Sequence, residues 1–521
     1  MSLAELRSIA PAPRIGGVSP PVVYAIATGL MALSVVAGFA TGITDWTPAA
    51  ILALPLVAIT ALWISGGAVT AILGLIAKRP RAQPVPVAWR PSAPTAILVT
   101  LCGEDPVPLS GHLRTLRAGL DENGLEHRTQ IFVLSDTSGN AQIAAEDAAF
   151  QDLRADGLIK YRRRVNNTGR KPGNIADWLS THGGDFTYMM VLDADSRMSA
   201  ARIRKMIWQI ESRPSLGLLQ AGISLVPGTT RFGCHQRVAA RLLSRNFGRG
   251  FAAWTGDSGN YWGHNAIMRT AAFEAAARLP RLSGAAPFGG SVLSHDFIEA
   301  AWMRRAGWSI ALDPDPLGSA EHAPQTLAEF HRRDRRWCQG NLQHIRLLTE
   351  PKLCMISRMH LVAGIVSYLA APIWLALIVL IASGFVPVGG VVPLLLVLLV
   401  LLVPKLCAMA DWVRRTRTVR RRRVAVRALT GELVLSSLIA PLVMVRHSMS
   451  ILSVCMGRDC GWKSGHAPRV SVPDGMAEMG IGMGLLALVW ASNGPAALWL
   501  APIVLPLCAA PLIVRALDAP A

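Results

Sequence analysis

Long apolar runs occupy both ends of the chain, with a stretch of mixed polar and apolar sequence between them. The runs Val22–Ile43 and Ala49–Ala77 come first, and Leu361–Phe385 and Val388–Ala410 follow the mixed stretch. Each is long enough to cross a membrane, since a transmembrane helix needs about 20 apolar residues. Residues 82–356 have ordinary soluble composition. The pattern predicts a membrane protein that carries one polar domain between two groups of helices.

The last part of the chain is harder to interpret. Leu433–Cys455 is apolar but contains an arginine, a histidine and several serines, and the basic segment Gly461–Arg469 follows it. Because both flanks are basic, an interfacial or re-entrant segment is favoured over a span. The runs Met476–Ala491 and Ala496–Leu512 predict a closing hairpin. We therefore expect six spans and one interfacial segment.

Basic residues beside the apolar runs set the expected orientation. Lys78–Arg81 and Arg414–Arg423 are rich in arginine and lysine, which favour the cytoplasmic side. The first apolar run has no small-residue cleavage site and is interpreted as an uncleaved helix. The expected layout is an N-terminal membrane hairpin (1–80), a cytoplasmic domain (82–356), a membrane hairpin (357–412), a basic loop with the interfacial or re-entrant segment (413–475) and a C-terminal membrane hairpin (476–521).

Composition agrees with this layout and excludes some classes of protein. The chain is 51% apolar and 16% charged, and its mean hydropathy is +0.37. The net charge of +19 comes largely from cations at the membrane edges and in the polar domain. Lipid headgroups and a diphosphate explain these cations better than nucleic acid does. The eight cysteines include no CxxC pair, so neither a disulfide framework nor a zinc site is expected.

The polar domain alternates short apolar runs with helical stretches. Its apolar runs are of the type found in buried parallel strands, and the segments between them have helical composition. The expected strands are 96–101, 131–134, 188–192 and 216–220, and the expected helices are 110–122, 140–155 and 200–211. This order predicts an α/β domain whose ligands bind at the carboxyl ends of the strands.

Acidic residues follow three of the expected strands. Asp193 and Asp195 lie two residues apart, so in the loop after a strand both can approach one divalent cation. Asp136 could accept a hydrogen bond from a uracil or ribose group, and Glu104 follows the first strand in the same way. Taken singly, each of these residues is more typical of a solvated turn than of a binding site.

Asp296 lies in Leu293–Glu299, a segment with the pattern of a helix start and with Ser294 as the cap. One interpretation is that Asp296 merely stabilises the positive end of the helix dipole. The other is that Asp296 is a general base that removes a proton from an acceptor hydroxyl. Attack on a nucleotide sugar with one base and no protein nucleophile would invert the anomeric centre.

Further along, Arg333, Arg336 and Trp337 form a cationic aromatic segment. Arginine can bind a diphosphate through two donors, and a tryptophan offers a flat apolar wall to a sugar ring. The alternative is an amphipathic basic segment that lies on lipid headgroups.

Two loops add candidate ligand contacts. Lys171 belongs to a basic loop, Arg170–Asn174, that could reach phosphate but is not a P-loop. His264 and Asn265 end the glycine-rich segment Thr255–Asn265, which suits a carbohydrate pocket and equally suits a simple turn.

The order of these motifs resembles the processive family 2 glycosyltransferases, which include bacterial cellulose synthase and hyaluronan synthase. That family has D, DxD, an acidic base motif and (Q/R)xxRW in sequence. The matching residues here are Asp136, Asp193 and Asp195, Asp296, and Arg333 with Arg336 and Trp337. The chain is more closely similar to the glucans biosynthesis glucosyltransferase H family, through Leu192–Ser196, Gly259–Asn265, Leu293–Asp296 and Arg332–His344. The base motif SHD and the initial Arg333 fit that family and weigh against cellulose synthesis.

The resemblance implies a multi-pass membrane protein with a cytoplasmic glycosyltransferase A-type (GT-A, Rossmann-like) domain in the bacterial inner membrane. It implies an inverting, processive enzyme that uses UDP-glucose and Mg²⁺ or Mn²⁺ to extend and export a β-1,2-glucan backbone of osmoregulated periplasmic glucans. The implied partners are the growing glucan, membrane lipids, a periplasmic glucan-processing protein and an acyl carrier protein.

The implied roles follow the motifs. Asp136 binds the uridine, Asp195 with Asp193 binds the metal and diphosphate, and Asp296 deprotonates the acceptor. Trp337 stacks on the terminal glucose, while Arg333 and Arg336 steady the diphosphate or the acceptor. Glu104, Lys171, His264 and Asn265 complete the set of expected substrate contacts.

Three other functions are possible, and particular residues disfavour some of them. A non-processive family 2 enzyme that glycosylates a lipid would keep the DxD pair and the base. A phosphatase with Asp193 as its nucleophile is disfavoured, because Arg197 stands where that motif requires Thr or Val. A transporter with a regulatory domain would explain the helices but not the ordered carboxylates.

Overall fold

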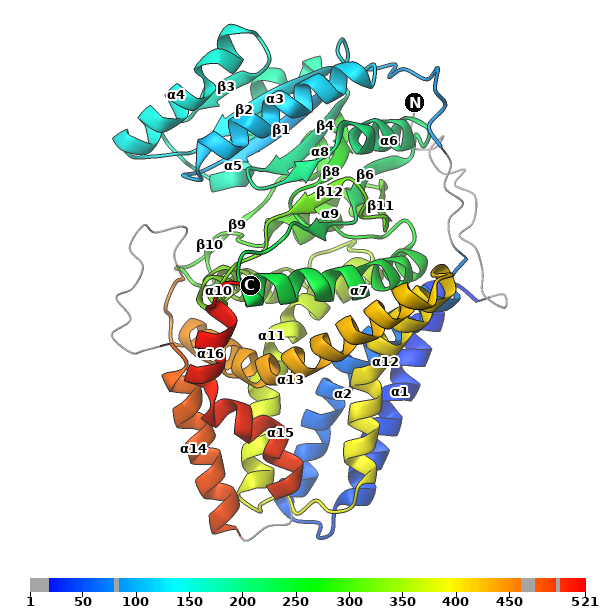
Figure 1. Ribbon diagram of the computed structural model, residues 1–521, viewed down its shortest axis with the longest axis vertical. Helices are drawn as coiled ribbons and strands as arrows, with labels where there is room; N and C mark the ends of the chain where they lie inside the picture. The colour runs from blue at the N-terminus through cyan, green and yellow to red at the C-terminus, as the bar shows by residue number, and fades with distance from the viewer. Residues whose placement is uncertain (1–17, 79–83, 461–473, 493–496) are drawn as a thin grey trace.

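A computed structural model describes residues 18–78, 84–460, 474–492 and 497–521. Figure 1 shows an α/β domain above a group of steep helices, with two long helices lying between these parts. The expected basic signals at Arg79, Arg81 and Gly461–Arg469 lie outside the described residues. The two-part organisation expected from hydropathy is therefore present.

The α/β domain is built on a seven-stranded sheet. All neighbouring strands are parallel except β8, which is antiparallel to both β4 and β6. The four expected strands are confirmed as β1, β2, β4 and β6. In spatial order the strands are β11 (Ser309–Asp313), β6 (Leu216–Ala221), β8 (Ala266–Arg269), β4 (Tyr188–Asp193), β1 (Thr95–Leu101), β2 (Thr129–Ser135) and β3 (Lys160–Arg163).

Helices cover both faces of this sheet. Alternate residues of the strands point to opposite faces, so that Ile97 and Val99 of β1 join one core while Ala96 and Leu98 join the other. The first core includes α3 (Pro106–Glu122), α4 (Asn140–Ala155) and α6 (Ala200–Glu211), and the second includes α5 (Arg170–His182), α8 (Thr270–Ala276) and α9 (His295–Arg305). The three expected helices are confirmed as α3, α4 and α6.

Short elements complete the domain around the sheet edge. One small sheet joins β5 to β12 and β12 to β7, and another pairs β9 with β10. The elements are β5 (Arg197–Met198), β7 (Ser224–Leu225), β9 (Arg281–Leu282), β10 (Gly290–Ser291), β12 (Ser319–Glu321) and the 3₁₀ turns η2 (Gly183–Asp185) and η3 (His344–Leu347).

Among the described residues, five helices are long and apolar enough to cross a membrane. They are α1 (Pro20–Gly42), α2 (Pro48–Ile76), α11 (Met355–Ala382), α12 (Val392–Arg415) and α13 (Val419–Cys455). The bent pair α15 (Ala497–Cys508) and α16 (Ala510–Asp518) would make a sixth if counted as one span, while α14 (Met476–Ala491) is shorter. Figure 1 shows α13 running obliquely across the steep helices, so its interfacial placement stays a prediction.

Two expectations about the membrane part are wrong. The basic stretch was expected to be a loop, yet only residues 416–418 interrupt the helices, and Arg420–Arg423 lie in the first turn of α13. Arginine is a good helix former, so a run of exposed arginines is compatible with a helix. The last apolar run was expected to be one helix, but α15 and α16 meet at 65°. Pro502 and Pro506 in α15 and Pro511 in the first turn of α16 each lack an amide hydrogen, which weakens the helical hydrogen bonding of this run and favours a bend.

Helix α7 (Arg231–Thr255) connects the α/β domain to the membrane helices. A Cβ atom placed on Gly250 would lie 2.8 Å from both the Thr70 carbonyl carbon and the Gly74 amide nitrogen of α2. The buried Arg249 guanidinium donates to the Gly74 carbonyl (3.0 Å) and to Asp411 of α12 (2.7 Å). Backbone contact and a buried ion pair therefore fix α7 on two membrane helices.

We expect Gly250→Ala to lower the thermal stability of the protein. The added methyl group meets backbone atoms that cannot move aside independently, and overpacking of this kind costs about 1–3 kcal/mol. Gly67→Ala on α2 is the matched control, because a Cβ there meets nothing within 4 Å. Thermal unfolding in detergent measures both variants; an equal midpoint for the two would contradict the close packing of α7 on α2.

Candidate active site

The carboxyl ends of β1, β2 and β4 meet at one edge of the sheet because these strands are parallel. Asp193 is the last residue of β4, and its Oδ1 accepts hydrogen bonds from Thr100 Oγ1 (3.1 Å) and from Lys171 Nζ. Its backbone N–H donates to Ser196 Oγ at 3.1 Å, which tightens the turn that follows. The DxD pair is thus held at this edge by contacts from β1 and α5 and from Ser196 in its own turn.

The two carboxyl groups of the pair have opposite electrostatic environments. Burial raises the pKa of Asp193, but Lys171 and His264 outweigh it and hold that pKa well below its usual range. Burial raises the pKa of Asp195 to about 6, with further contributions from the carboxylates of Asp193, Glu321 and Glu104. Asp195 therefore lies in a buried group of negative charges that a cation would stabilise.

His264 supplies positive charge beside this group. Its Nε2 lies 3.1 Å from Glu321 Oε2, and its Nδ1 lies 3.5 Å from Ser196 Oγ. Burial lowers the pKa of His264, but Asp193 and Glu321 raise it to about 9. The ring is therefore protonated at neutral pH and can donate to an anionic ligand. Glu321, on β12, was not expected from the sequence.

Asp136 follows β2 and is almost fully engaged by neighbouring residues. Arg164 binds both of its carboxylate oxygens, Nε to Oδ1 and Nη2 to Oδ2, each at 2.8 Å. Asn174 Nδ2 donates to Oδ1 at 2.8 Å. Since an ionised carboxylate has about four acceptor positions, one position on Oδ2 is left after these three bonds. Direct contact of Asp136 with a uridine would be limited to that position, and Arg164 becomes a further candidate for the same subsite.

Lys171 joins the DxD edge to the loop that approaches Asp296. The sequence indicated a loop here, but residues 170–174 begin helix α5. Lys171 Nζ donates to Asp193 and to the Gly263 carbonyl (2.8 Å), and the Tyr261 hydroxyl donates to the same carbonyl at 2.7 Å. Gly263 has a φ of +86°, a conformation that favours glycine.

Asp296 lies close to Gly263, the residue whose carbonyl accepts from Lys171 and Tyr261. A Cβ atom placed on Gly263 would lie 3.6 Å from Asp296 Oδ2. Burial raises the pKa of Asp296, and the positive charge of His295 partly opposes the effect. His295 Nδ1 in turn lies 2.9 Å from Glu299 Oε2. Asp296 and the DxD pair are therefore linked through Gly263, which lies close to Asp296, and Lys171, which contacts both Gly263 and Asp193.

Ser294 occupies the N-cap position of α9, as expected, but its hydroxyl makes no capping bond. Its φ of −92° and ψ of 66° lie outside the extended region that capping residues usually adopt. Asn265 is fully buried, and its Nδ2 donates to Ser319 Oγ at 3.0 Å. This geometry gives Asn265 a supporting role under the site, in place of the substrate contact that the sequence suggested.

Helix α10 (Leu327–Gln343) carries the cationic aromatic segment. The Arg333 guanidinium lies over the Trp337 ring, 4.7 Å from its centroid, and Trp337 is 47% exposed. Burial lowers the pKa of Arg336, while Glu104 is among the nearby groups that act on it in the opposite sense. Trp337 therefore presents an accessible ring that is backed by a guanidinium.

The second half of α10 holds the segment that leads into Asp296. Gln343 Oε1 accepts from the Leu293 amide at 2.9 Å, and its Nε2 donates to the carbonyls of Pro287 (3.2 Å) and Ser291 (3.3 Å). His344 Nε2 lies 2.8 Å from the Ser294 carbonyl, and burial lowers its pKa to about 4, so the neutral ring donates this bond. The sequence gave these residues no role, although both end the motif Arg332–His344.

The residues around Asp195 fit a divalent metal ion through their chemistry. Within the described ranges, no group of three or more His, Cys, Asp or Glu side chains is arranged to hold a metal. Mg²⁺, however, is commonly bound by one or two carboxylates together with substrate phosphates. The oxygen donors of Asp193 and Asp195, buried among further carboxylates, provide such a partial site.

Comparison with known proteins agrees with this geometry. Residues 188–413 match the model of the Glycosyl transferase family group 2. Together with the DxD pair, the facing Asp296 and the segment on α10, the match defines the protein as a glycosyltransferase with a GT-A-like domain and several apolar helices.

Two curated relatives, both named glucans biosynthesis glucosyltransferase H, identify the family. The protein from Xanthomonas euvesicatoria pv. vesicatoria is 36% identical over 85% of this chain and 75% of its own length. That from Rhodopseudomonas palustris is 36% identical over 79% of this chain and 62% of its own length. This chain belongs to the glucans biosynthesis glucosyltransferase H family.

Among solved structures, the mannosyltransferase PcManGT from Pyrobaculum calidifontis, in complex with GDP-Man and Mn²⁺, is 15% identical. The match covers 78% of this chain and 98% of that one, with a TM-score of 0.44.

We expect Gly340→Ala on α10 to reduce turnover while largely preserving donor binding. A Cβ at this position would lie 2.5 Å from the Ser294 amide nitrogen and 2.9 Å from Ser294 Cβ, so it would displace the residues that lead into Asp296. A shift of about 1 Å at a reacting group can cost roughly a hundredfold in rate. Steady-state kinetics give kcat and KM, and Gly111→Ala, in open space on α3, is the control. An unchanged kcat in Gly340→Ala would contradict the positioning role of α10.

Proposed function

We propose that this protein transfers glucose from UDP-glucose to the end of a growing glucan, with inversion and without a covalent enzyme intermediate. The observation that carries the proposal is the junction at Lys171, which contacts Asp193 on one side and the Gly263 carbonyl, next to Asp296, on the other. A donor diphosphate at the DxD pair and an acceptor hydroxyl at Asp296 would then share one small space.

On the donor side, the nucleoside would lie at the carboxyl ends of β1 and β2, near Asp136, Arg164 and Glu104. The protonated His264 and the Lys171 ammonium would donate to the diphosphate. Asp195, with Asp193, would hold Mg²⁺ or Mn²⁺, which when bound neutralises charge on the departing diphosphate. Arg336 of α10, whose pKa is influenced by Glu104, would add a further cation for the diphosphate.

On the acceptor side, Asp296 would accept the proton of the attacking hydroxyl. The hydroxyl oxygen forms a bond to the anomeric carbon as the bond to the diphosphate breaks, and UDP leaves with its electrons. Burial raises the pKa of Asp296, which makes the ionised form a stronger base. The exposed ring of Trp337, backed by Arg333, would stack on the terminal sugar.

The nature of the product rests on family membership. The names of the relatives support a glucan, and the family resemblance supports β-1,2 linkage, repeated addition and passage of the chain outward through the inner membrane. Helix α10 lies against α11 and α13: the Tyr368 hydroxyl of α11 donates to Asp334 at 3.0 Å, and His447 of α13 lies 2.5 Å from the same carboxylate. A glucan that leaves Trp337 would therefore begin next to apolar helices, on the cytoplasmic side in this proposal.

Product analysis tests the proposal directly. Purified protein in vesicles receives Mg²⁺ and radiolabelled UDP-glucose, and UDP release and product size are measured. A long glucan that accumulates on the side of the vesicle membrane opposite the donor supports polymerisation with export. A short lipid-linked product would reassign the protein to lipid glycosylation, and the absence of UDP release with any nucleotide sugar would overturn the proposal. The acyl carrier protein and the periplasmic processing protein can be added to the same assay as proposed partners.

Asp296→Asn should lower the rate of glucose transfer by about a thousandfold or more, so that transfer is effectively abolished, while UDP binding is retained. An amide cannot accept the proton, and general base catalysis contributes typically 10²–10⁴-fold. The exposed Asp185→Asn is the matched control and should keep wild-type activity. UDP release and UDP binding are measured on the same preparations. Loss of both would indicate misfolding, and retained transfer would exclude Asp296 as the base.

Binding of UDP together with Mg²⁺ should weaken as the pH falls through about 6. Asp195 must be ionised to bind the cation, and its pKa in the free protein is about 6, so protons compete with the metal below that value. Asp195→Asn should bind weakly at every pH and lose this dependence. Calorimetric titration between pH 5 and 8 checks the prediction; a flat profile in the wild type would show that Asp195 is not a ligand.

A further inference from the structure

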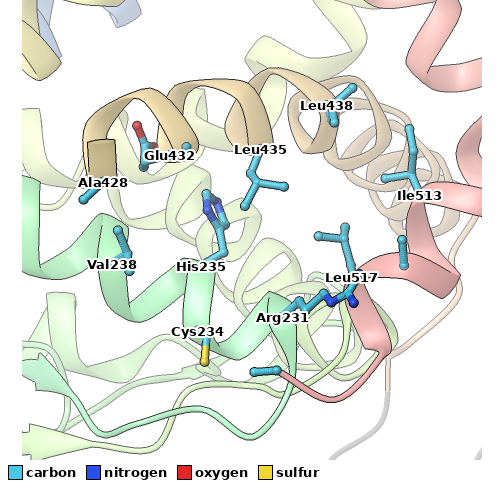
Figure 2. A pocket seen from close by; sticks show the side chains of 13 residues that line it. Arg231, Cys234, His235, Val238, Ala428, Glu432, Leu435, Leu438, Ile513 and Leu517 are labelled. Carbon is cyan, nitrogen blue, oxygen red and sulfur yellow. The ribbon is translucent and has the colours of Figure 1, made fainter. Parts of the chain in front are cut away.

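A cavity lies away from the candidate active site, between α7, α13 and α16. Its volume is about 590 Å³, and its lining is apolar apart from a few groups. Figure 2 shows Leu435 and Leu438 of α13 facing Ile513 and Leu517 of α16 across it. A water molecule takes up about 30 Å³ of liquid, so the cavity has room for roughly 20 water-sized groups, about the size of one acyl chain.

The cavity is continuous with surfaces that suit lipid. On α13, the lining residue Leu435 follows the exposed Leu433 and Val434, and on α16 the lining residue Ile513 follows the exposed Leu512. Helix α13 is apolar enough to be a candidate span, and Figure 1 shows α7 lying just above the steep helices. The cavity therefore lies beside helices that are long and apolar enough to cross a membrane.

The polar groups of the cavity favour an anionic headgroup. Arg231 is exposed at the start of α7, and its guanidinium has no hydrogen-bond or ion-pair partner in the part of the chain that the structure describes. His235 has a buried Nδ1 without a partner. The carboxylate of Glu432 is paired with Lys405 of α12, so its negative charge does not oppose an anion.

We propose that this cavity binds one anionic phospholipid, with an acyl chain between α13 and α16 and the phosphate at Arg231. The exposed arginines 420–423 at the start of α13 attract the same lipids to this face of the protein. This site is independent of the proposed sugar transfer.

All three helices that line the cavity contact the first turn of α10. Phe232 of α7 lies against Phe330, with ring centroids 6.0 Å apart. Arg446 of α13 donates to the Leu327 carbonyl at 3.1 Å, and Asp518 of α16 accepts from the Leu327 amide at 3.2 Å. A lipid that fills the cavity would therefore stabilise the helices that hold α10 in place.

Photolabelling of the purified full chain tests the site. The probe is phosphatidylglycerol with a diazirine in its acyl chain, and labelled peptides are mapped by mass spectrometry. We expect labels in the parts of α7, α13 and α16 that line the cavity. A phosphatidylcholine probe should label these segments several-fold less; equal labelling by both probes would overturn the assignment to an anionic lipid.

Two variants and two controls give a quantitative result. Gly431 lines the cavity, and a Cβ there meets nothing within 4 Å, so Gly431→Phe can enter the empty space. Gly431→Phe and Arg231→Gln should each reduce labelling about tenfold, the effect of losing a contact worth about 1.4 kcal/mol. Gly484→Phe on α14, also in open space, and Arg114→Gln, at an exposed arginine on α3, should label as the wild type does. Undiminished labelling in Gly431→Phe would overturn the proposal.

A thermal measurement separates binding from a folding defect. Without added lipid, the variants should unfold at the wild-type temperature. Phosphatidylglycerol should raise the unfolding temperature of the wild type and of Gly484→Phe more than that of Gly431→Phe, because only the first two keep the cavity open. An equal increase in all three proteins would mean that the lipid acts elsewhere, and would contradict the proposed site.

Discussion

The packing of α10 is the constraint on which the rest of the site depends. Gly340 lies directly against Ser294, and Gln343 and His344 bind the backbone of the segment that precedes Asp296. The opposite side of the helix contacts the membrane part through Asp334, which lies between Tyr368 and His447. One rigid helix therefore sets the distance between the expected base, the exposed Trp337 and the helices along which a product would leave.

At the edge of the sheet, the local environment shifts the pKa values of two neighbouring aspartates in opposite directions. Asp193 and Asp195 are chemically identical, yet Lys171 and His264 hold the pKa of Asp193 below its usual range, while burial and then neighbouring carboxylates raise the pKa of Asp195. Such a separation is typical of functional sites, where burial and specific partners shift pKa values in opposite directions. A bound cation and diphosphate would relieve the excess of negative charge at Asp195 and occupy the donors of Lys171 and His264.

Buried polar contacts couple the α/β domain to the membrane helices. Arg249 reaches from α7 to Gly74 and Asp411, and Arg446 reaches from α13 to Glu478 of α14 (2.5 Å) and to the start of α10. A buried charge that loses its partner costs several kcal/mol, so these pairs resist separation of the two parts. The lipid cavity lies beside the same contacts, which gives membrane composition a physical route to α10.

The features that depend on local pattern can be predicted from the amino-acid sequence. Continuous apolar runs identify β1, β2, β4 and β6, because such strands are buried on both faces, and the order of the acidic motifs places Asp136, Asp193 and Asp195 at one edge of a parallel sheet. The four-residue strand β8 was not expected, because so short a segment has no distinctive periodicity and is defined by its antiparallel pairing with β4 and β6.

Tertiary structure alone decided which distant groups meet. Arg164 binds Asp136 across 28 residues, Lys171 reaches Gly263 across 92, and Gln343 holds Leu293 across 50. A local pattern contains no information on such pairings, because they arise only when the strands and helices pack into a common core. The motif order therefore predicted the chemistry of the site, and the packing of α10 against Ser294 and of α5 against Gly263 decided its geometry.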